Sequence, residues 1–206
     1  MNRPVHKNED LHGNAPDSCP VVLLLVDVLN DVDFPGNSRL LKSINSLGKN
    51  ISALKKRCKE AGIPVIYVND NRGKWRSDYS AVLSHCLRPD SPGCPMVGQL
   101  IPEASDYIVL KPKHSAFYAT PLDTLFSYLK AKTVILAGLI TNACILSTAS
   151  ELYVRDLDVY VPSDCVAAPI KQAHRYGLEV MKISFDVDTT SSTKLNLRKI
   201  LKTARL

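Results

Sequence analysis

Residues 132–155, KTVILAGLITNACILSTASELYVR, combine a short apolar run with a helical pattern. The run 134–137 is β-branched at its start and is followed by Gly138, which is typical of a strand buried on both faces. Thr141 and Asn142 are residue types that favour helix starts, and an apolar periodicity then continues to Tyr153. The segment therefore predicts a buried strand that leads directly into a helix.

Cys144 lies in the first turn of this predicted helix. The unpaired N–H groups and the dipole of a helix start favour a negative charge. A thiol at such a position is expected to have a depressed pKa and to exist partly as the nucleophilic thiolate. The alternative is that Cys144 is a small buried hydrophobic residue, which is the usual role of an intracellular cysteine.

The rest of the chain alternates predicted strands with predicted helices, without an internal repeat or a linker. Strands are expected at 20–27, 63–68, 106–110, 134–137, 158–161 and 181–185, and helices at 38–61, 121–130, 141–153, 170–180 and from residue 194 onward. Residues 81–98 are expected to be irregular or to hold a short helix. This pattern predicts an α/β fold, a three-layer α/β/α sandwich with a Rossmann-like, mostly parallel six-stranded sheet. The domain is expected to span 20–206, after a polar arm at 1–19.

Three chemically matched residues fall at or just after the carboxyl ends of predicted strands: Asp27, Lys111 and Cys144. Ligands of open α/β sheets bind at this edge. Taken singly, each has a plain structural interpretation, as a turn residue, an exposed cation and a packed thiol. Together they supply a nucleophile, a carboxylate that can take its proton and a cation that stabilises a thiolate, as covalent catalysis requires.

Composition restricts the class of protein further. The 206 residues carry a formal net charge of +6, and five of these charges lie from Lys194 onward, where a terminal helix with one packed and one solvated basic side is expected. We therefore expect no nucleic-acid partner. No apolar run approaches the ~20 residues of a membrane span, and the first residues lack a signal-peptide centre. A cytoplasmic location is expected, with the six cysteines as reduced thiols.

Three motifs resemble those of the isochorismatase-like cysteine hydrolases, a superfamily that contains nicotinamidases, N-carbamoylsarcosine amidases and isochorismatases. They are DVLND at 27–31, KPKHSAFYATPLD at 111–123 and GLITNAC at 138–144. The resemblance covers about residues 21–188. It implies a cis peptide bond between Leu139 and Ile140, and an oxyanion hole made of the backbone N–H groups of Ile140 and Cys144. It also implies a homo-oligomer, either a dimer or a tetramer.

The chain departs from its relatives at the metal site that nicotinamidases carry. Asp70 matches that pattern, but Arg72 stands where the first histidine is expected, and the following loop offers only His85. A carboxylate beside a guanidinium favours an ion pair, so no metal and no other cofactor is expected. Leu29 also replaces a glutamine that relatives often carry. Asn30 is expected to orient Asp27.

Several further residues are given structural or pocket roles. Asp31 is expected to be structural, and Asp164 to be a buried structural carboxylate. The pocket walls are expected to include four aromatic residues: Phe34, Trp75, Phe117 and Tyr118.

Three functions are left open. The first is a metal-independent cysteine hydrolase that acts on a small-molecule amide through a thioester on Cys144. The second is an isochorismatase-like hydrolase of a vinyl ether. The third is a non-catalytic protein that uses the same fold for self-association or for binding a partner.

Overall fold

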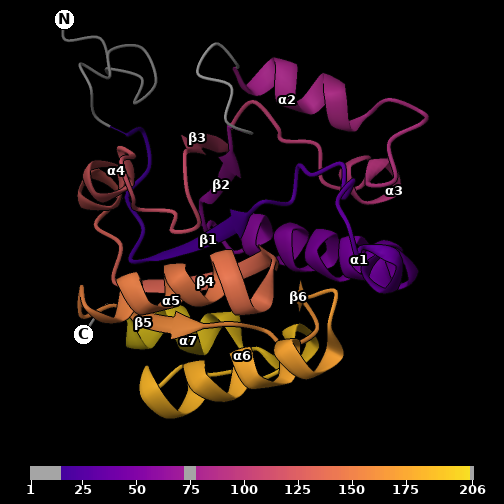
Figure 1. Cartoon of the computed structure of the whole chain (residues 1–206). Helices are drawn as coiled ribbons and strands as arrows, with labels where there is room; N and C mark the ends of the chain where they lie inside the picture. Colours follow the sequence, from indigo (N-terminus) through magenta and orange to yellow (C-terminus); the bar gives the residue numbers. More distant parts are fainter. Residues whose placement is uncertain (1–14, 72–77, 205–206) are drawn as a thin grey trace, which may run out of the picture.

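The computed structural model describes residues 15–71 and 78–204. Within them, helices cover both faces of a parallel sheet, which confirms the expected three-layer α/β/α architecture (Figure 1). The strands follow the order β3-β2-β1-β4-β5, and β6 pairs with β4 beyond the point where β5 ends. Their bounds are β1 (Val21–Val26), β2 (Val65–Asp70), β3 (Tyr107–Lys111), β4 (Thr133–Leu139), β5 (Asp158–Tyr160) and β6 (Val166–Ala167).

The helices divide between two apolar clusters, one on each face of the sheet. One face is covered by α1 (Ser38–Glu60), α2 (Tyr79–Cys86), α3 (Cys94–Val97) and α7 (Leu197–Thr203). The other is covered by α4 (Leu122–Leu129), α5 (Leu146–Tyr153) and α6 (Lys171–Ser184). A π-helical turn at Thr141–Ile145 joins β4 to α5, and a 3-10 turn at Ser192–Lys194 precedes α7.

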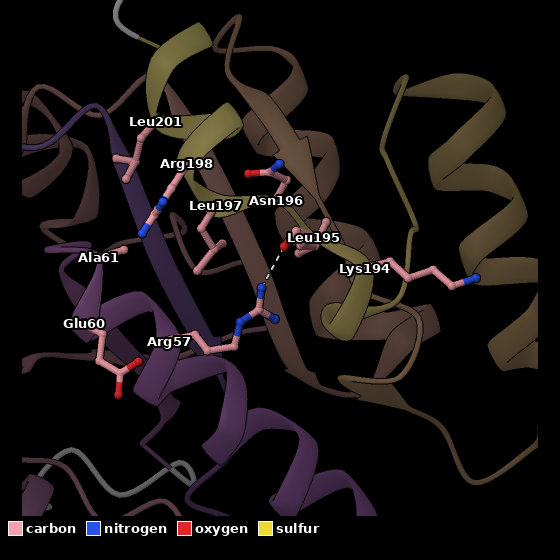
Figure 2. A pocket seen from close by; sticks show the side chains of 9 residues that line it. All are labelled: Arg57, Glu60, Ala61, Lys194, Leu195, Asn196, Leu197, Arg198 and Leu201. Atoms are coloured by element: carbon pink, nitrogen blue, oxygen red, sulfur yellow. Dashed lines mark hydrogen bonds between the residues drawn. The ribbon is translucent and has the colours of Figure 1, made fainter.

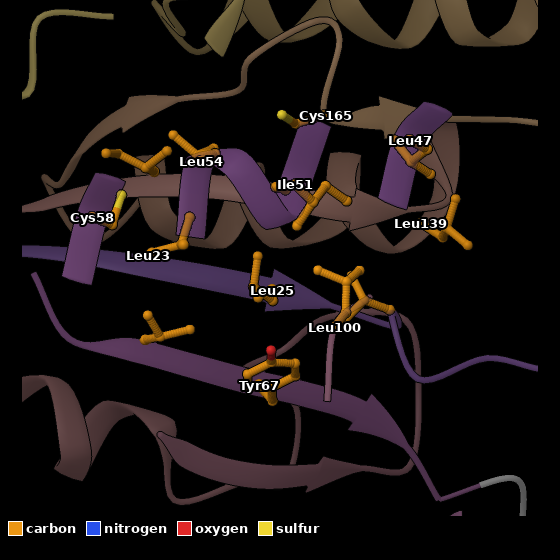
Figure 3. Close-up of a cluster of buried hydrophobic side chains, with 14 of the residues drawn as sticks. Leu23, Leu25, Leu47, Ile51, Leu54, Cys58, Tyr67, Leu100, Leu139 and Cys165 are labelled. Atoms are coloured by element: carbon orange, nitrogen blue, oxygen red, sulfur yellow. The ribbon is translucent and has the colours of Figure 1, made fainter. Parts of the chain in front are cut away.

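Strand β1 shows why a continuous apolar run forms the middle of this sheet. Leu23 and Leu25 point into the cluster beneath α1, while Leu24 and Val26 point into the opposite cluster, and all four are fully buried. Figure 3 shows the α1 side, where Leu23 and Leu25 lie between helix α1 and Tyr67 of β2. Burial of each aliphatic side chain contributes about 1.5–3 kcal/mol, so both helical layers hold β1 in place.

The predicted sixth strand at 181–185 is wrong. Residues up to Ser184 continue helix α6, and the sixth strand is instead the two-residue β6. Met181 and Gly177 are one helical turn apart, and both are buried. A short apolar run cannot be assigned to a strand or a helix from periodicity alone, and here its buried positions follow the helical spacing.

Residues 81–98 contain α3 and most of α2, in line with the short helix expected there. Residues just before position 20 also pack on the domain, because Cys19 is buried and its N–H donates to the Leu129 carbonyl oxygen at 2.9 Å. The Asp17 carboxylate accepts a hydrogen bond from the Tyr107 hydroxyl at 2.6 Å. The expected arm therefore includes residues that pack on the sheet and on α4.

The terminal helix forms with one packed side, as expected, and that side lies against the protein's own core. Leu197 and Ile200 of α7 are buried in the cluster beneath α1. All six cysteines lie within the described residues and are thiols, as expected. None of the described helices combines the length and the apolar character that crossing a membrane requires.

Candidate active site

The ends of three strands bring Asp27, Lys111 and Cys144 together at one rim of the sheet. Asp27 follows β1, Lys111 ends β3, and Cys144 follows β4 in the π-helical turn. The Lys111 ammonium nitrogen Nζ lies 2.8 Å from Asp27 Oδ2 and 3.6 Å from Cys144 Sγ. Asp27 also raises the pKa of the Cys144 thiol. Lys111 therefore links the carboxylate to the sulfur, although the three residues are far apart in the sequence.

Asp27 is held from two sides. Its Oδ1 accepts a hydrogen bond from the backbone N–H of Asp70 at 2.8 Å, and Oδ2 faces Lys111. Its backbone has a φ of 52°, in the left-handed region that aspartate tolerates better than most residues. Just beyond it, the Asn69 side-chain amide donates to the Leu29 carbonyl oxygen at 2.8 Å. These bonds fix the carboxylate at the point where the chain leaves β1.

Lys111 is fully buried, and three acceptors surround its ammonium group. Nζ contacts Asp27 Oδ2 and Cys144 Sγ and donates to the Lys113 carbonyl oxygen at 3.0 Å. Burial alone disfavours the charged amine, but Asp27 and Cys144 outweigh it, so the pKa of Lys111 is raised. The site therefore keeps a permanent cation beside the sulfur.

The protonation state of Cys144 differs from the expectation based on its place at a helix start. Burial and the Asp27 carboxylate raise the pKa of the Cys144 thiol to about 12, although Lys111 acts in the opposite direction. The predicted depressed pKa is therefore wrong, because desolvation outweighs the helix start. Burial also raises the pKa of Asp27, with Lys111 opposing it. The raised thiol pKa keeps the proton on the sulfur at rest, and the raised pKa of Asp27 makes its carboxylate a stronger base.

The loop before Cys144 offers a backbone N–H group as a hydrogen-bond donor. The peptide bond between Leu139 and Ile140 is cis, at the position that the family resemblance implied. The Ile140 carbonyl oxygen accepts from the N–H groups of Ala143 at 2.9 Å and Ile145 at 3.2 Å. In the described part of the chain, no group accepts a hydrogen bond from the Ile140 N–H. That donor is available to an oxyanion.

Two contacts hold this loop against its neighbours. Gly138 has a φ of 126°, and a Cβ atom there would lie 1.9 Å from the Val26 carbonyl oxygen. Only glycine therefore allows β4 to pass β1 so closely. On the other side, Thr141 Oγ1 lies 2.8 Å from His174 Nδ1 of helix α6. Burial lowers the pKa of His174, which favours its neutral form.

Asn30 forms no hydrogen bond with Asp27, although it was expected to orient this carboxylate. Its Oδ1 accepts from the Val32 backbone N–H at 2.7 Å and so stabilises the loop after β1. The Asp70 N–H and Lys111 orient Asp27 in its place. Asp31 has the structural role expected of it, because its Oδ2 lies 2.8 Å from His85 Nε2 of α2.

The aromatic residues predicted to line the pocket have different surroundings. Phe117 is buried edge-on against Phe126, and the Arg155 guanidinium stacks on its ring at 4.1 Å. Phe117 therefore packs in the core, and its role as a pocket wall stays a prediction. Phe34 is partly buried against the cluster beneath α1, and Tyr118 is 59% exposed.

Three further predictions concern the loop after β2 and the segment after β5. Trp75 and Arg72 lie outside the described residues, so both remain predictions. Asp164 is half-buried rather than buried, and its carboxylate accepts from the Ser192 N–H at 2.6 Å and from the Ser192 hydroxyl at 2.7 Å. Asp164 thus anchors the 3-10 turn before α7.

The sequence did not identify His114 as part of this site. Its Nδ1 lies 3.7 Å from Cys144 Sγ, within hydrogen-bonding range of a sulfur atom. Its only sequence signal is that it follows Lys111 by three residues, inside the lysine motif. A lone exposed histidine in a loop does not by itself indicate a contact with a residue 30 positions away.

A separate hollow of about 670 Å³ lies at the opposite end of the sheet, between the carboxyl end of α1 and helix α7 (Figure 2). Arg57 reaches across it and donates to the Leu195 carbonyl oxygen at 2.7 Å. This hollow contains none of the rim residues. Among residues 15–71 and 78–204, no group of three histidine, cysteine or acidic side chains has a metal-binding arrangement.

Comparison with known proteins gives one consistent result. Residues 21–193 match the Isochorismatase domain family. An uncharacterized isochorismatase family protein, YaaI of Bacillus subtilis, is 31% identical over 84% of this chain and 94% of its own length. A probable inactive nicotinamidase of Arabidopsis thaliana is 28% identical over 78% of this chain and 87% of its own.

The solved structures agree at the level of the fold. N-carbamoylsarcosine amidase from Thermoplasma acidophilum superposes with a TM-score of 0.65 at 23% identity, over 85% of this chain and 98% of that one. The family match spans most of the chain and includes the strand ends that carry Asp27, Lys111 and Cys144. The protein therefore belongs to the isochorismatase family of hydrolases.

Proposed function

We propose that this protein is a metal-independent cysteine hydrolase that cleaves the C–N bond of a small-molecule amide. The observation that carries the proposal is the contact of Lys111 with both Asp27 and Cys144 at the carboxyl rim of the sheet. A thiol, a carboxylate that can take its proton and a fixed cation are the groups that thioester chemistry needs.

In the first half of the reaction, Asp27 takes the thiol proton as Cys144 Sγ attacks the carbonyl carbon. The thiol pKa of about 12 means that little thiolate exists at rest, so deprotonation and attack are coupled. Lys111 stabilises the developing negative sulfur. The oxyanion accepts hydrogen bonds from the backbone N–H groups of Ile140 and Cys144.

The second half regenerates the enzyme. Asp27 returns its proton to the leaving nitrogen, the C–N bond breaks, and ammonia departs if the substrate is a primary amide. Water then gives a proton to Asp27 while its oxygen adds to the thioester carbonyl. The C–S bond breaks, and the sulfur recovers the proton from Asp27 beside the Lys111 cation.

A screen for ammonia release from a panel of small amides, with intact-mass detection of an acyl adduct on Cys144, tests this proposal. We expect Cys144→Ala to abolish both the adduct and the turnover of every hit. A Cys144→Ala variant that retains full activity contradicts the thioester mechanism. Turnover of a vinyl ether without an adduct supports the isochorismatase-like alternative, and the absence of any turnover supports a non-catalytic role.

We also propose a homo-oligomer, a dimer or tetramer, that forms through α6. Tyr176, Val180 and Ile183 follow one helical stripe on its surface, and Ile183 is 75% exposed. A two-fold axis lets such a stripe pack against its own copy. Light scattering on the native protein should give a mass above that of one chain, and Ile183→Glu should lower it while the matched surface change Lys182→Glu should not.

The thiol state of all six cysteines fits a reducing compartment. We therefore propose a cytoplasmic location for the enzyme.

A further inference from the structure

We propose that His114 is a further catalytic residue, which donates a hydrogen bond from Nδ1 to the Cys144 sulfur and stabilises the thiolate during catalysis. This inference rests on the proposed cysteine chemistry. It begins with the number of donors around the sulfur. Two nitrogen atoms lie within hydrogen-bonding range of the Cys144 sulfur, Lys111 Nζ at 3.6 Å and His114 Nδ1 at 3.7 Å.

Lys111 supplies one of these donors and has no further proton to offer. Its three contacts are Cys144 Sγ at 3.6 Å, Asp27 Oδ2 at 2.8 Å and the Lys113 carbonyl oxygen at 3.0 Å. An ammonium group has three N–H bonds, so this set accounts for all of them. A second donor to the sulfur must come from another residue, and His114 Nδ1 at 3.7 Å is in range.

The backbone around His114 is anchored to the elements that carry the catalytic groups. The carbonyl oxygen of Lys113, one residue before it, accepts from Lys111. Two residues after it, the Ala116 N–H donates to Thr148 Oγ1 of α5 at 3.1 Å. Thr148 is fully buried and lies four residues after Cys144 on the same helical segment. These bonds fix the loop over the sulfur.

The proposed bond requires the proton of His114 on Nδ1, which leaves a lone pair on Nε2 in the neutral ring. No described residue forms a hydrogen bond with Nε2 of His114, and the side chain is exposed. The Nδ1–H bond strengthens as negative charge develops on the sulfur, both when Cys144 attacks and when the sulfur leaves the thioester, because bonds to charged acceptors are stronger than neutral ones.

The test measures alkylation of Cys144 by iodoacetamide in the full-length protein, with mass spectrometry to separate the six cysteines. His114→Phe removes the donor, whereas His114→Asn keeps an N–H near the position of Nδ1. Loss of a hydrogen bond to a charged sulfur lowers the thiolate population by tenfold or more, and the higher nucleophilicity of a more basic thiolate offsets part of this. We expect alkylation to slow roughly fivefold to fifteenfold in His114→Phe and to stay within about twofold in His114→Asn.

Lys113→Ala is the matched control, because it removes a neighbouring charge while the backbone carbonyl that binds Lys111 remains. It should alkylate at the wild-type rate. A wild-type rate in His114→Phe, or an equal loss in His114→Asn, overturns the proposal. Alkylation reports on the sulfur and not on hydrolysis, so failure of the proposed function appears separately, as full turnover by Cys144→Ala. Since the His114 side chain is exposed, unfolding is not expected, and unchanged circular dichroism checks this.

Discussion

The Lys111 ammonium lies 2.8 Å from the Asp27 carboxylate, with the lysine fully buried and the aspartate nearly so. Two buried charges at this distance depend on each other, because removal of either leaves the other uncompensated. The same pair acts on the sulfur, because Asp27 raises the pKa of the Cys144 thiol and Lys111 places a positive charge 3.6 Å from Sγ.

Loss of one partner of this pair should destabilise the fold as well as abolish turnover. Lys111→Met is expected to cost about 3–5 kcal/mol of unfolding free energy, and the double variant with Asp27→Asn should recover much of it. The exposed pair Lys56–Glu60 is the control, and Lys56→Met should cost under about 1 kcal/mol. Urea unfolding measures all three. A Lys111→Met cost equal to that of Lys56→Met contradicts the prediction.

Asp27→Asn should reduce turnover even where the fold survives. The amide cannot accept the thiol proton, and loss of a general base costs about 10²–10⁴ in rate. Steady-state kinetics on a substrate from the amide screen measures this loss. A fall of less than tenfold would indicate that another group accepts the proton.

The pH dependence of Cys144 alkylation should follow its raised thiol pKa. With a pKa of about 12, the thiolate fraction rises throughout the range from pH 7 to 10. The rate should therefore climb across this range without levelling. Alkylation that is quenched at fixed times and quantified by mass spectrometry gives the rate at each pH. A plateau by pH 8 would mean that the thiolate already dominates at rest and that the helix start outweighs burial.

Gly138→Ala should be strongly destabilising, because a Cβ atom there would lie 1.9 Å from the Val26 carbonyl oxygen and the backbone has a φ of 126°. We expect a loss of about 3 kcal/mol or more, as in overpacked cores. Gly98→Ala is the matched control, since a Cβ atom there would lie 3.4 Å from its nearest neighbour, the Cys94 carbonyl oxygen. Thermal unfolding that shifts equally in the two variants would contradict this account.

His174 should make the fold sensitive to mild acid. Burial lowers its pKa below the ordinary value of about 6.5, so the unfolded chain takes up the proton first as the pH falls. The stability from neutral His174 is therefore complete above about pH 6.5 and is lost below it. Between pH 7.5 and 5.5 the unfolding midpoint should fall further in the wild type than in His174→Asn. Equal falls would exclude His174 as the cause.

Sequence patterns located the rim residues correctly as strand ends but misassigned residues 181–185. Asp27, Lys111 and Cys144 lie at or after the ends of clearly apolar runs, so their strands could be predicted. The run at 181–185 is too short to distinguish a strand from the end of a helix, and its register in α6 depends on which residues the sheet buries.

The sequence by itself determined the layered α/β fold and the three residues at its rim, because both depend on local apolar runs and on where they end. Only the tertiary structure decided the proton's resting place on Cys144, the loop role of Asn30, the core role of Phe117 and the contact of His114 with the sulfur. These depend on desolvation and on contacts between segments far apart in the chain, which spacing along the sequence does not encode.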